Sequence, residues 1–267
     1  MKDNLAVVHL IRHSNNIEHL KAFIKSYHKN KAGLEHTLVL IFKGFSSEKV
    51  SQEYMNVLSQ TKFIAMYLDD NMFDLDTYFT VARETNFNTY MFLNSFSIIL
   101  AENWLKLMVS RLNGNVGLVG ATGSWQRLYD VNRLKVMNIR EKVHFLLQAR
   151  YRLFFPPFPN CHIRTNAFLI KKSIIDKIKF PTIRNKFDAH RFESGYKSLT
   201  RQVIKLGFKP VIVGRDGYAY ECKDWKISGV FRSKGQENLL VEDNQTKAWE
   251  IADESRKKLI ESVTWGT

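Results

Sequence analysis

The stretch that decides the fold is Leu5–Ile11, LAVVHLI, a short apolar run bounded by polar residues. Uninterrupted apolar runs of this length are typical of parallel strands that are covered on both faces. Four more follow at regular intervals: TLVLIF at 37–42, FIAMYL at 63–68, YMFL at 90–93 and VGLV at 116–119. The first half of the chain therefore contains five predicted strands.

Segments with helical spacing of apolar residues separate these strands. In residues 15–29, the apolar side chains recur at intervals of three and four, and we expect further helices at 48–58, 74–84 and 104–112. Strands that alternate with helices at this pitch indicate βαβ units. The predicted fold class is α/β, a three-layer α/β/α sandwich with a mostly parallel central sheet.

The pattern is less regular after residue 120. Strands are expected at 167–170 (AFLI) and 210–213 (PVIV). Helices are expected at 139–155, in a short segment from Ser173, at 198–206 and around 246–263.

Ligands of open α/β sheets bind outside the carboxyl ends of the strands. In this chain that rule selects the polar patches at 12–16, 43–45, 69–76 and 94–97. Because the carboxyl ends of parallel strands meet at one edge of the sheet, we expect these patches to lie together.

The formal net charge is +14, so the protein should attract phosphate groups. The excess is spread along the chain, and no block of five like charges marks a nucleic-acid tail. Zinc-finger spacing and an RNP-like aromatic motif are also missing from the sequence, so no nucleic-acid partner is expected.

Cys161 and Cys222 have no paired spacing, which argues against a disulfide scaffold and against a thiolate zinc site. The N-terminal apolar run ends in charge too soon for a signal peptide or a membrane span. We expect a cytoplasmic protein, with membrane association on the inner face as a further option.

The order of the later elements resembles that of the GT-A glycosyltransferases, in particular the family 2-like and rhamnosyltransferase-like enzymes. The strand YMFL ends in Asn94-Ser95-Phe96-Ser97, and the strand AFLI precedes FDAHRFESGYKSLTRQVIKLGFKPVIVGRDG at 187–217. Asp74–Tyr78 also looks like the D-x-x-x-Y/F stretch of rhamnosyltransferase-like members. In this family a strand ends in an Asp-x-Asp motif, and a later carboxylate near an Arg-containing helix is the catalytic base.

The resemblance covers roughly residues 5–220 and implies a domain organisation. Residues 1–220 would form the glycosyltransferase domain, with 1–120 as its nucleotide-binding half and 121–220 as its acceptor and catalytic half. Residues 221–267 would be a C-terminal extension packed on it.

Glu193 occupies the position of the family's catalytic carboxylate, with His190 and Arg201 as further catalytic candidates. A general base is needed to take the proton of the acceptor hydroxyl. The alternatives are that Glu193 is an exposed residue at a helix start, favoured there by the helix dipole, and that His190 is structural.

The sequence departs from the family at the metal-binding motif. Asn94 and Phe96 stand where the two aspartates would be, and neither supplies a carboxylate. Mg²⁺ or Mn²⁺ is therefore not expected at the usual site. The diphosphate would instead meet cationic side chains, with Arg12, Lys43, Arg164, Arg191 and Arg201 as candidates.

Other nucleotide-sugar contacts are expected from Asn15, Asp74, Asp76, Asn94 and Ser95. Helix capping is the alternative role for Asn15 and Asp74.

The resemblance predicts transfer of a hexosyl or deoxyhexosyl group, with inversion, from a nucleotide-sugar to a hydroxyl of a surface glycan or glycolipid. The alternative is a module of the same fold that binds nucleotide or glycan without catalysis. The sequence does not fix the oligomeric state.

Overall fold

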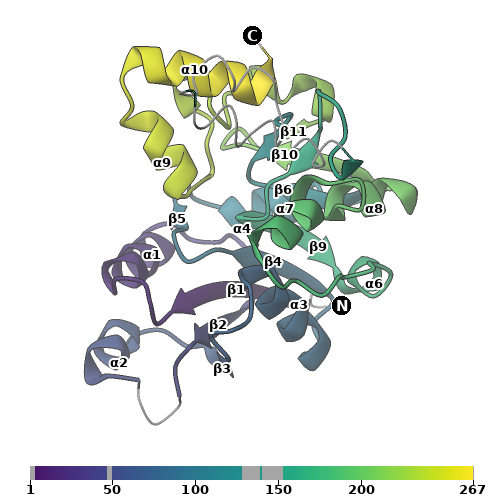
Figure 1. Cartoon of the computed structure of the whole chain (residues 1–267). Coiled ribbons are helices and arrows are strands. Elements are labelled where there is room, and N and C mark those ends of the chain that lie inside the picture. Colours follow the sequence, from purple (N-terminus) through teal and green to yellow (C-terminus); the bar gives the residue numbers. More distant parts are fainter. Residues whose placement is uncertain (1–3, 47–49, 128–138, 140–152, 267) are drawn as a thin grey trace.

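The computed structural model describes residues 4–46, 50–127, 139 and 153–266. An eight-stranded sheet with the order β11-β10-β6-β9-β4-β1-β2-β3 runs through the molecule (Figure 1). The strands are β1 (Leu5–Arg12), β2 (Thr37–Lys43), β3 (Ile64–Leu68), β4 (Thr89–Leu93), β6 (Val116–Gly120), β9 (Ala167–Lys171), β10 (Lys209–Val213) and β11 (Ala219–Tyr220).

The sheet is mixed but mostly parallel. Strands β1 to β4 form one parallel group, and β6 and β10 form another. Strand β9 joins the two groups and runs antiparallel to both β4 and β6, while β11 runs antiparallel to β10. The carboxyl ends of all six parallel strands consequently lie at one edge.

Helices cover both faces of the sheet. Alternate residues of β1 point to opposite cores, with Ala6 and Val8 in one and Leu5 and Val7 in the other. The first core also contains side chains of α3 (Asp74–Glu84), α6 (Lys172–Ile175), α7 (Lys186–Ser194) and α8 (Leu199–Lys205). The second contains side chains of α1 (Glu18–Lys29), α2 (Gln52–Leu58) and α4 (Trp104–Val109). The predicted three-layer α/β/α sandwich is confirmed.

The C-terminal segment, residues 221–266, packs against the sheet and its loops. Its short strand β12 (Val241–Glu242) pairs with β5 (Ile98–Ile99), and its Trp225 and Trp265 are buried in the first core. The single helix predicted around 246–263 is wrong, because two helices occupy the region, α9 (Asn244–Glu250) and α10 (Glu254–Trp265). Asp243 caps the start of α9 and Asp253 caps the start of α10, so the chain leaves the helical conformation between the two helices. The helix predicted at 139–155 lies almost wholly outside the described residues.

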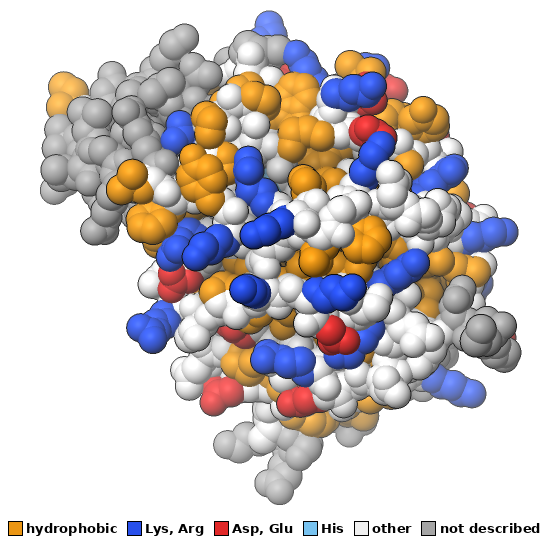
Figure 2. Space-filling model, turned by 90° about the vertical axis from the view of Figure 1, so that its right-hand side faces the viewer, with side chains coloured by type: hydrophobic (Ala, Val, Ile, Leu, Met, Phe, Trp, Pro, Cys, Tyr) orange, Lys and Arg blue, Asp and Glu red, His pale blue; other side chains and the backbone are white. Residues whose placement is uncertain are grey.

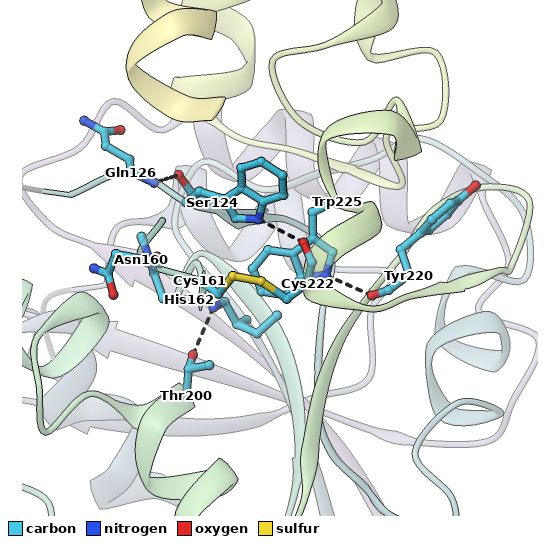
Figure 3. The surroundings of a disulfide bond; sticks show 11 residues. Ser124, Gln126, Asn160, Cys161, His162, Thr200, Tyr220, Cys222 and Trp225 are labelled. Carbon is cyan, nitrogen blue, oxygen red and sulfur yellow. Dashed lines mark hydrogen bonds between the residues drawn. A yellow bond between two sulfur atoms is a disulfide. The ribbon is translucent and has the colours of Figure 1, made fainter. Parts of the chain in front are cut away.

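A disulfide joins Cys161 to Cys222, contrary to our expectation from the cysteine spacing (Figure 3). The cysteines are 61 residues apart in sequence. In the fold, Cys222 in η4 (Cys222–Asp224) lies beside Cys161, which directly precedes β8 (His162–Ile163). Trp125 Nε1 donates to the carbonyl of Cys222 at 2.9 Å. The bond therefore links the C-terminal segment to the two-stranded sheet formed by β8 and its partner β7 (Gly123–Ser124).

Among the described helices, none has the length and apolar character that crossing a membrane requires.

Candidate functional site

A cavity of about 640 Å³ lies at the carboxyl edge of the parallel strands. Its wall includes Arg12 at the end of β1, Lys43 at the end of β2, Asp70 and Asp74 after β3, and Asn94 after β4. All four polar patches selected from the sequence thus contribute to one site. The expectation that they meet is confirmed.

Lys43 is a buried cation in this wall, with a side chain only 3% exposed. Its Nζ lies 3.7 Å from Asp70 Oδ1 and 3.8 Å from Asp74 Oδ1, and Arg12 Nε also lies 3.8 Å from Asp74 Oδ1. These separations balance the charges but are too long for hydrogen bonds. Within the described residues Lys43 Nζ has no hydrogen-bond acceptor, so its donors are available to a ligand.

Three more buried polar groups of this cavity lack a hydrogen-bond partner among the described residues: Arg12 Nε, Tyr78 OH and Asn166 Nδ2. Burial raises the pKa of Tyr78, which keeps its hydroxyl protonated and able to donate. Buried polar groups are almost always hydrogen-bonded in proteins. The cavity is therefore suited to a ligand with many oxygen acceptors.

The C-terminal segment enters the site through Asp243. Its Oδ2 pairs with Arg164 Nη2 at 2.8 Å, and its Oδ1 accepts from the backbone N–H groups of Gln245 and Thr246 at the start of α9. The sequence pattern predicts no site residue in this segment. The available signal was the aspartate followed three residues later by Thr246, a helix-start pattern that carries no information about a ligand.

Glu193 lies in the last turn of α7, so the alternative of a helix-start residue is wrong. Its Oε1 accepts hydrogen bonds from Thr165 N and Thr165 Oγ1, both at 2.9 Å. Burial alone would raise the pKa of Glu193, but His162, the Thr165 N–H, Arg164 and His190 together lower it. The carboxylate is therefore ionised at neutral pH.

Burial lowers the pKa of His162, against the opposing effect of Glu193. His162 is therefore neutral at pH 7, and at that pH the Arg164 guanidinium is the positive neighbour of the Glu193 carboxylate.

A second cavity of about 320 Å³ adjoins the first. Arg164, His190 and Glu193 line both, so the ionised carboxylate lies at their boundary. Figure 3 shows three of the second cavity's residues, Ser124, Gln126 and His162, beside the disulfide. The remaining lining residues are Ser194, Phe231, Arg232 and Gln245, three of which come from the C-terminal segment.

Two of the expected nucleotide contacts bond to each other instead. Asn15 Nδ2 donates to Ser95 Oγ at 2.9 Å, and both residues line a hollow of about 10 Å³ and neither of the two larger cavities. Asp76, which does not line the large cavity, accepts from Phe73 N at the start of α3. Asp76 therefore makes the capping contact that we considered for Asp74, whereas Asp74 lies in the cavity wall.

Arg191 and Arg201 line neither of the two larger cavities. The Arg191 guanidinium lies 4.5 Å from the centre of the Phe154 ring, and that of Arg201 lies 5.8 Å from the centre of the Tyr196 ring. Both cations contact aromatic neighbours, so neither guanidinium contributes to these cavities.

The side chains at the end of β4 do not fit a divalent cation. Asn94 Oδ1 accepts from Phe96 N and Ser97 Oγ at 3.1 and 3.0 Å, and the Phe96 side chain has no oxygen. The nearby carboxylates of Asp70 and Asp74 lie beside Lys43, and Asp74 also lies beside Arg12. Among the described residues no group of three or more His, Cys, Asp or Glu could hold a metal ion. The donor set thus differs from the metal site that the family resemblance implies.

No protein-family model matches the chain, and no curated protein matches it in sequence. The solved structures that match the chain include two glycosyltransferases. One is a mannosyltransferase from Pyrobaculum calidifontis in complex with GDP-Man and Mn²⁺, with 12% identity, 98% of this chain and 70% of that chain covered, and a TM-score of 0.49. The other is core-mannan synthase A from Aspergillus fumigatus in a Mn/GDP form, with 11% identity, coverage of 78% and 72%, and a TM-score of 0.40.

Proposed function

We propose that this chain is a glycosyltransferase that moves a sugar from a nucleotide-sugar to an acceptor hydroxyl. The observation that carries the proposal is the position of Glu193. Its ionised carboxylate lies between a large cavity with unused hydrogen-bond donors and a smaller polar cavity. A base between donor and acceptor is what such a transfer requires.

The donor would occupy the first cavity. Lys43, Tyr78 and Asn166 offer donors to the ribose and diphosphate oxygens, and Asp70 and Asp74 could accept from ribose hydroxyls or the base. The leaving diphosphate would be neutralised by Arg164 and Lys186, which line the same cavity, and His190 could form a hydrogen bond with it. Cations that match phosphate oxygens would then replace the divalent metal.

The acceptor would occupy the second cavity, whose lining contains hydroxyl, amide and imidazole groups. These groups can form hydrogen bonds with the hydroxyls of a sugar. The acceptor oxygen would attack the anomeric carbon, its proton would pass to Glu193, and the carbon–diphosphate bond would break with both electrons leaving on the phosphate oxygen. Attack from the side opposite the leaving group inverts the anomeric centre.

In this proposal residues 1–120 form most of the donor wall, while 121–220 supply Glu193 and Arg164. Residues 221–267 complete both cavities. The sugar would be a hexose or deoxyhexose and the acceptor a surface glycan or glycolipid.

The test combines binding and turnover. Titration calorimetry with a panel of nucleoside diphosphates should detect binding in EDTA, without added Mg²⁺ or Mn²⁺. Glu193→Gln should lower sugar transfer by about 10²- to 10⁴-fold and leave nucleotide affinity unchanged, because the amide keeps the shape but cannot accept the proton. Glu84→Gln, an exposed change on α3, is the matched control.

Absence of nucleotide binding would contradict the proposal. Binding without any transfer in the wild type would favour the alternative of a non-catalytic binding module. A strict requirement for a divalent cation would contradict the metal-free donor site.

A further inference from the structure

The segment 171–209 carries much of the positive charge of the protein. It contains eleven Lys and Arg but only three Asp and Glu, a net charge of +8 out of the +14 of the chain. Figure 2 shows the side of the molecule on which α6 and α8 lie in Figure 1. Lys and Arg side chains are spread over this side, and Asp and Glu are fewer. Lys and Arg therefore outnumber Asp and Glu on this side, as they do in the segment 171–209.

Gln202 of α8 holds the basic segments together. Its Oε1 accepts from Lys179 N at 2.8 Å, and its Nε2 donates to the carbonyls of Lys197 and Lys179 at 2.9 and 3.2 Å. The loops on either side are therefore fixed beside the helix. We define the α8 surface as Lys177, Lys179, Lys197, Arg201 and Lys205, together with the apolar residues Tyr196, Ile204 and Leu206.

The charge of the α8 surface is not neutralised within the described part of the protein. Of the acids in the segment, Asp176 pairs with Lys172 at 2.7 Å and Asp188 lies 3.8 Å from Arg191. Glu193 faces the cavities. None of the five α8-surface cations forms an ion pair with a described residue, so their positive potential extends into solvent.

Exposed apolar side chains lie among these cations. Tyr196 is 51% exposed, Ile204 49% and Leu206 36%. The combination of Lys and Arg with exposed aliphatic and aromatic groups is typical of surfaces that bind at the membrane interface. A nucleic acid would be attracted by the charge but would gain little from Ile204 and Leu206.

We propose that the α8 surface docks on a lipid bilayer that contains anionic phospholipids. The phospholipid headgroups would face the lysines, and the three apolar side chains would enter the interfacial layer. The docking does not depend on the proposed transferase activity, because none of these residues lines either cavity. Lys186, which is exposed and lines the donor cavity, connects the same basic segment to the rim of the site.

The test is co-sedimentation of the full chain with vesicles, without nucleotide or sugar. One set contains phosphatidylcholine alone and the other contains added phosphatidylglycerol. Binding should occur only to the anionic vesicles and should weaken as salt is raised. The quadruple change of Lys177, Lys179, Lys197 and Lys205 to Ala should lower the affinity at least about tenfold.

The matched control replaces Lys25, Lys29, Lys31 and Lys106 with Ala, which removes the same charge from exposed positions on α1, on α4 and in the loop between α1 and β2, on the other side of the sheet. This control should bind like the wild type, whereas Ile204→Ser with Leu206→Ser should weaken binding without changing the net charge. Circular dichroism checks that each variant is folded.

Several outcomes would overturn the docking proposal: no binding of the wild type to anionic vesicles, equal losses in the control and the quadruple variant, or displacement from vesicles by an equal phosphate concentration of duplex DNA or RNA. Transfer to a soluble acceptor, measured separately, reports on the catalytic proposal alone.

Discussion

Asp243 Oδ2 lies 2.8 Å from Arg164 Nη2, and this contact joins the C-terminal segment to the residues that lead into β9. The side chains are 0% and 12% exposed, so the pair is removed from water. Arg164 also lines both cavities. The same ion pair therefore bears on the stability of the fold and on the shape of the site.

Asp243→Ala should lower the free energy of unfolding by about 3–5 kcal/mol, because it leaves the Arg164 charge buried and unpaired. It also removes the cap of α9. Urea unfolding followed by circular dichroism measures the change. The control is Asp253→Ala, which removes the cap of α10 but no buried ion pair. Equal losses in the two variants would show that Asp243 acts only as a helix cap.

Lys43→Met should weaken nucleoside diphosphate binding by about 10- to 150-fold, the range expected for the loss of one charged hydrogen bond. The methionine keeps most of the buried volume, and Arg12 still faces Asp74. Titration calorimetry measures the affinity, with the exposed Lys31→Met as the control. An unchanged affinity would remove Lys43 from the proposed donor site.

His9 should make the protein less stable in acid. Its ring is stacked on Phe23 with 3.6 Å between centroids, and burial lowers its pKa from 6.5 to about 3. Between these values the unfolded chain binds a proton that the folded chain does not. Stability contributed by the neutral ring is complete above pH 6.5 and is lost at about 1.4 kcal/mol per pH unit as the pH falls towards 3.

His9→Phe keeps the stacked ring and removes this titration. Urea unfolding at several pH values should therefore show a shallower decline for the variant, by about one proton. Parallel curves for the two proteins would mean that His9 is not buried as described.

Replacing both Cys161 and Cys222 with Ser should lower the free energy of unfolding by about 4 kcal/mol, the loop-closure effect for a separation of 61 residues. Dithiothreitol should destabilise the wild type by a similar amount and leave the double variant unchanged. A non-reduced peptide map should contain the linked peptides. Because such bonds persist in oxidising compartments, a map of protein taken directly from cells would also test the expected cytoplasmic location.

Much of the fold follows from local sequence patterns. The apolar runs predict the strands of the parallel groups, and the helix expected at 74–84 has the bounds observed for α3. The carboxyl-edge rule brings Arg12, Lys43 and Asn94 to one cavity without knowledge of any contact. These successes share a cause, because strand periodicity and chain direction are local properties.

Other features depend on contacts between distant residues, which a single sequence does not encode in a periodic pattern. The reversal of β9 has no local signal. Phe231, Arg232 and Asp243 belong to a segment of short 3₁₀ turns and brief strands, where no apolar repeat indicates which side chains face inward. The pairing of Asn15 with Ser95 spans 80 residues and moves two polar side chains out of the predicted site.

The late position of Asp243 in the chain has a consequence for biosynthesis. The ribosome releases the ends of β1, β2 and β4 long before it reaches the segment that completes both cavities. A nascent chain would hold Arg164 without its carboxylate partner until the start of α9 has emerged. Both cavities are therefore completed only after residues 231–245 have been made, and a chain that stopped before them would keep most of the sheet but lack a finished binding surface.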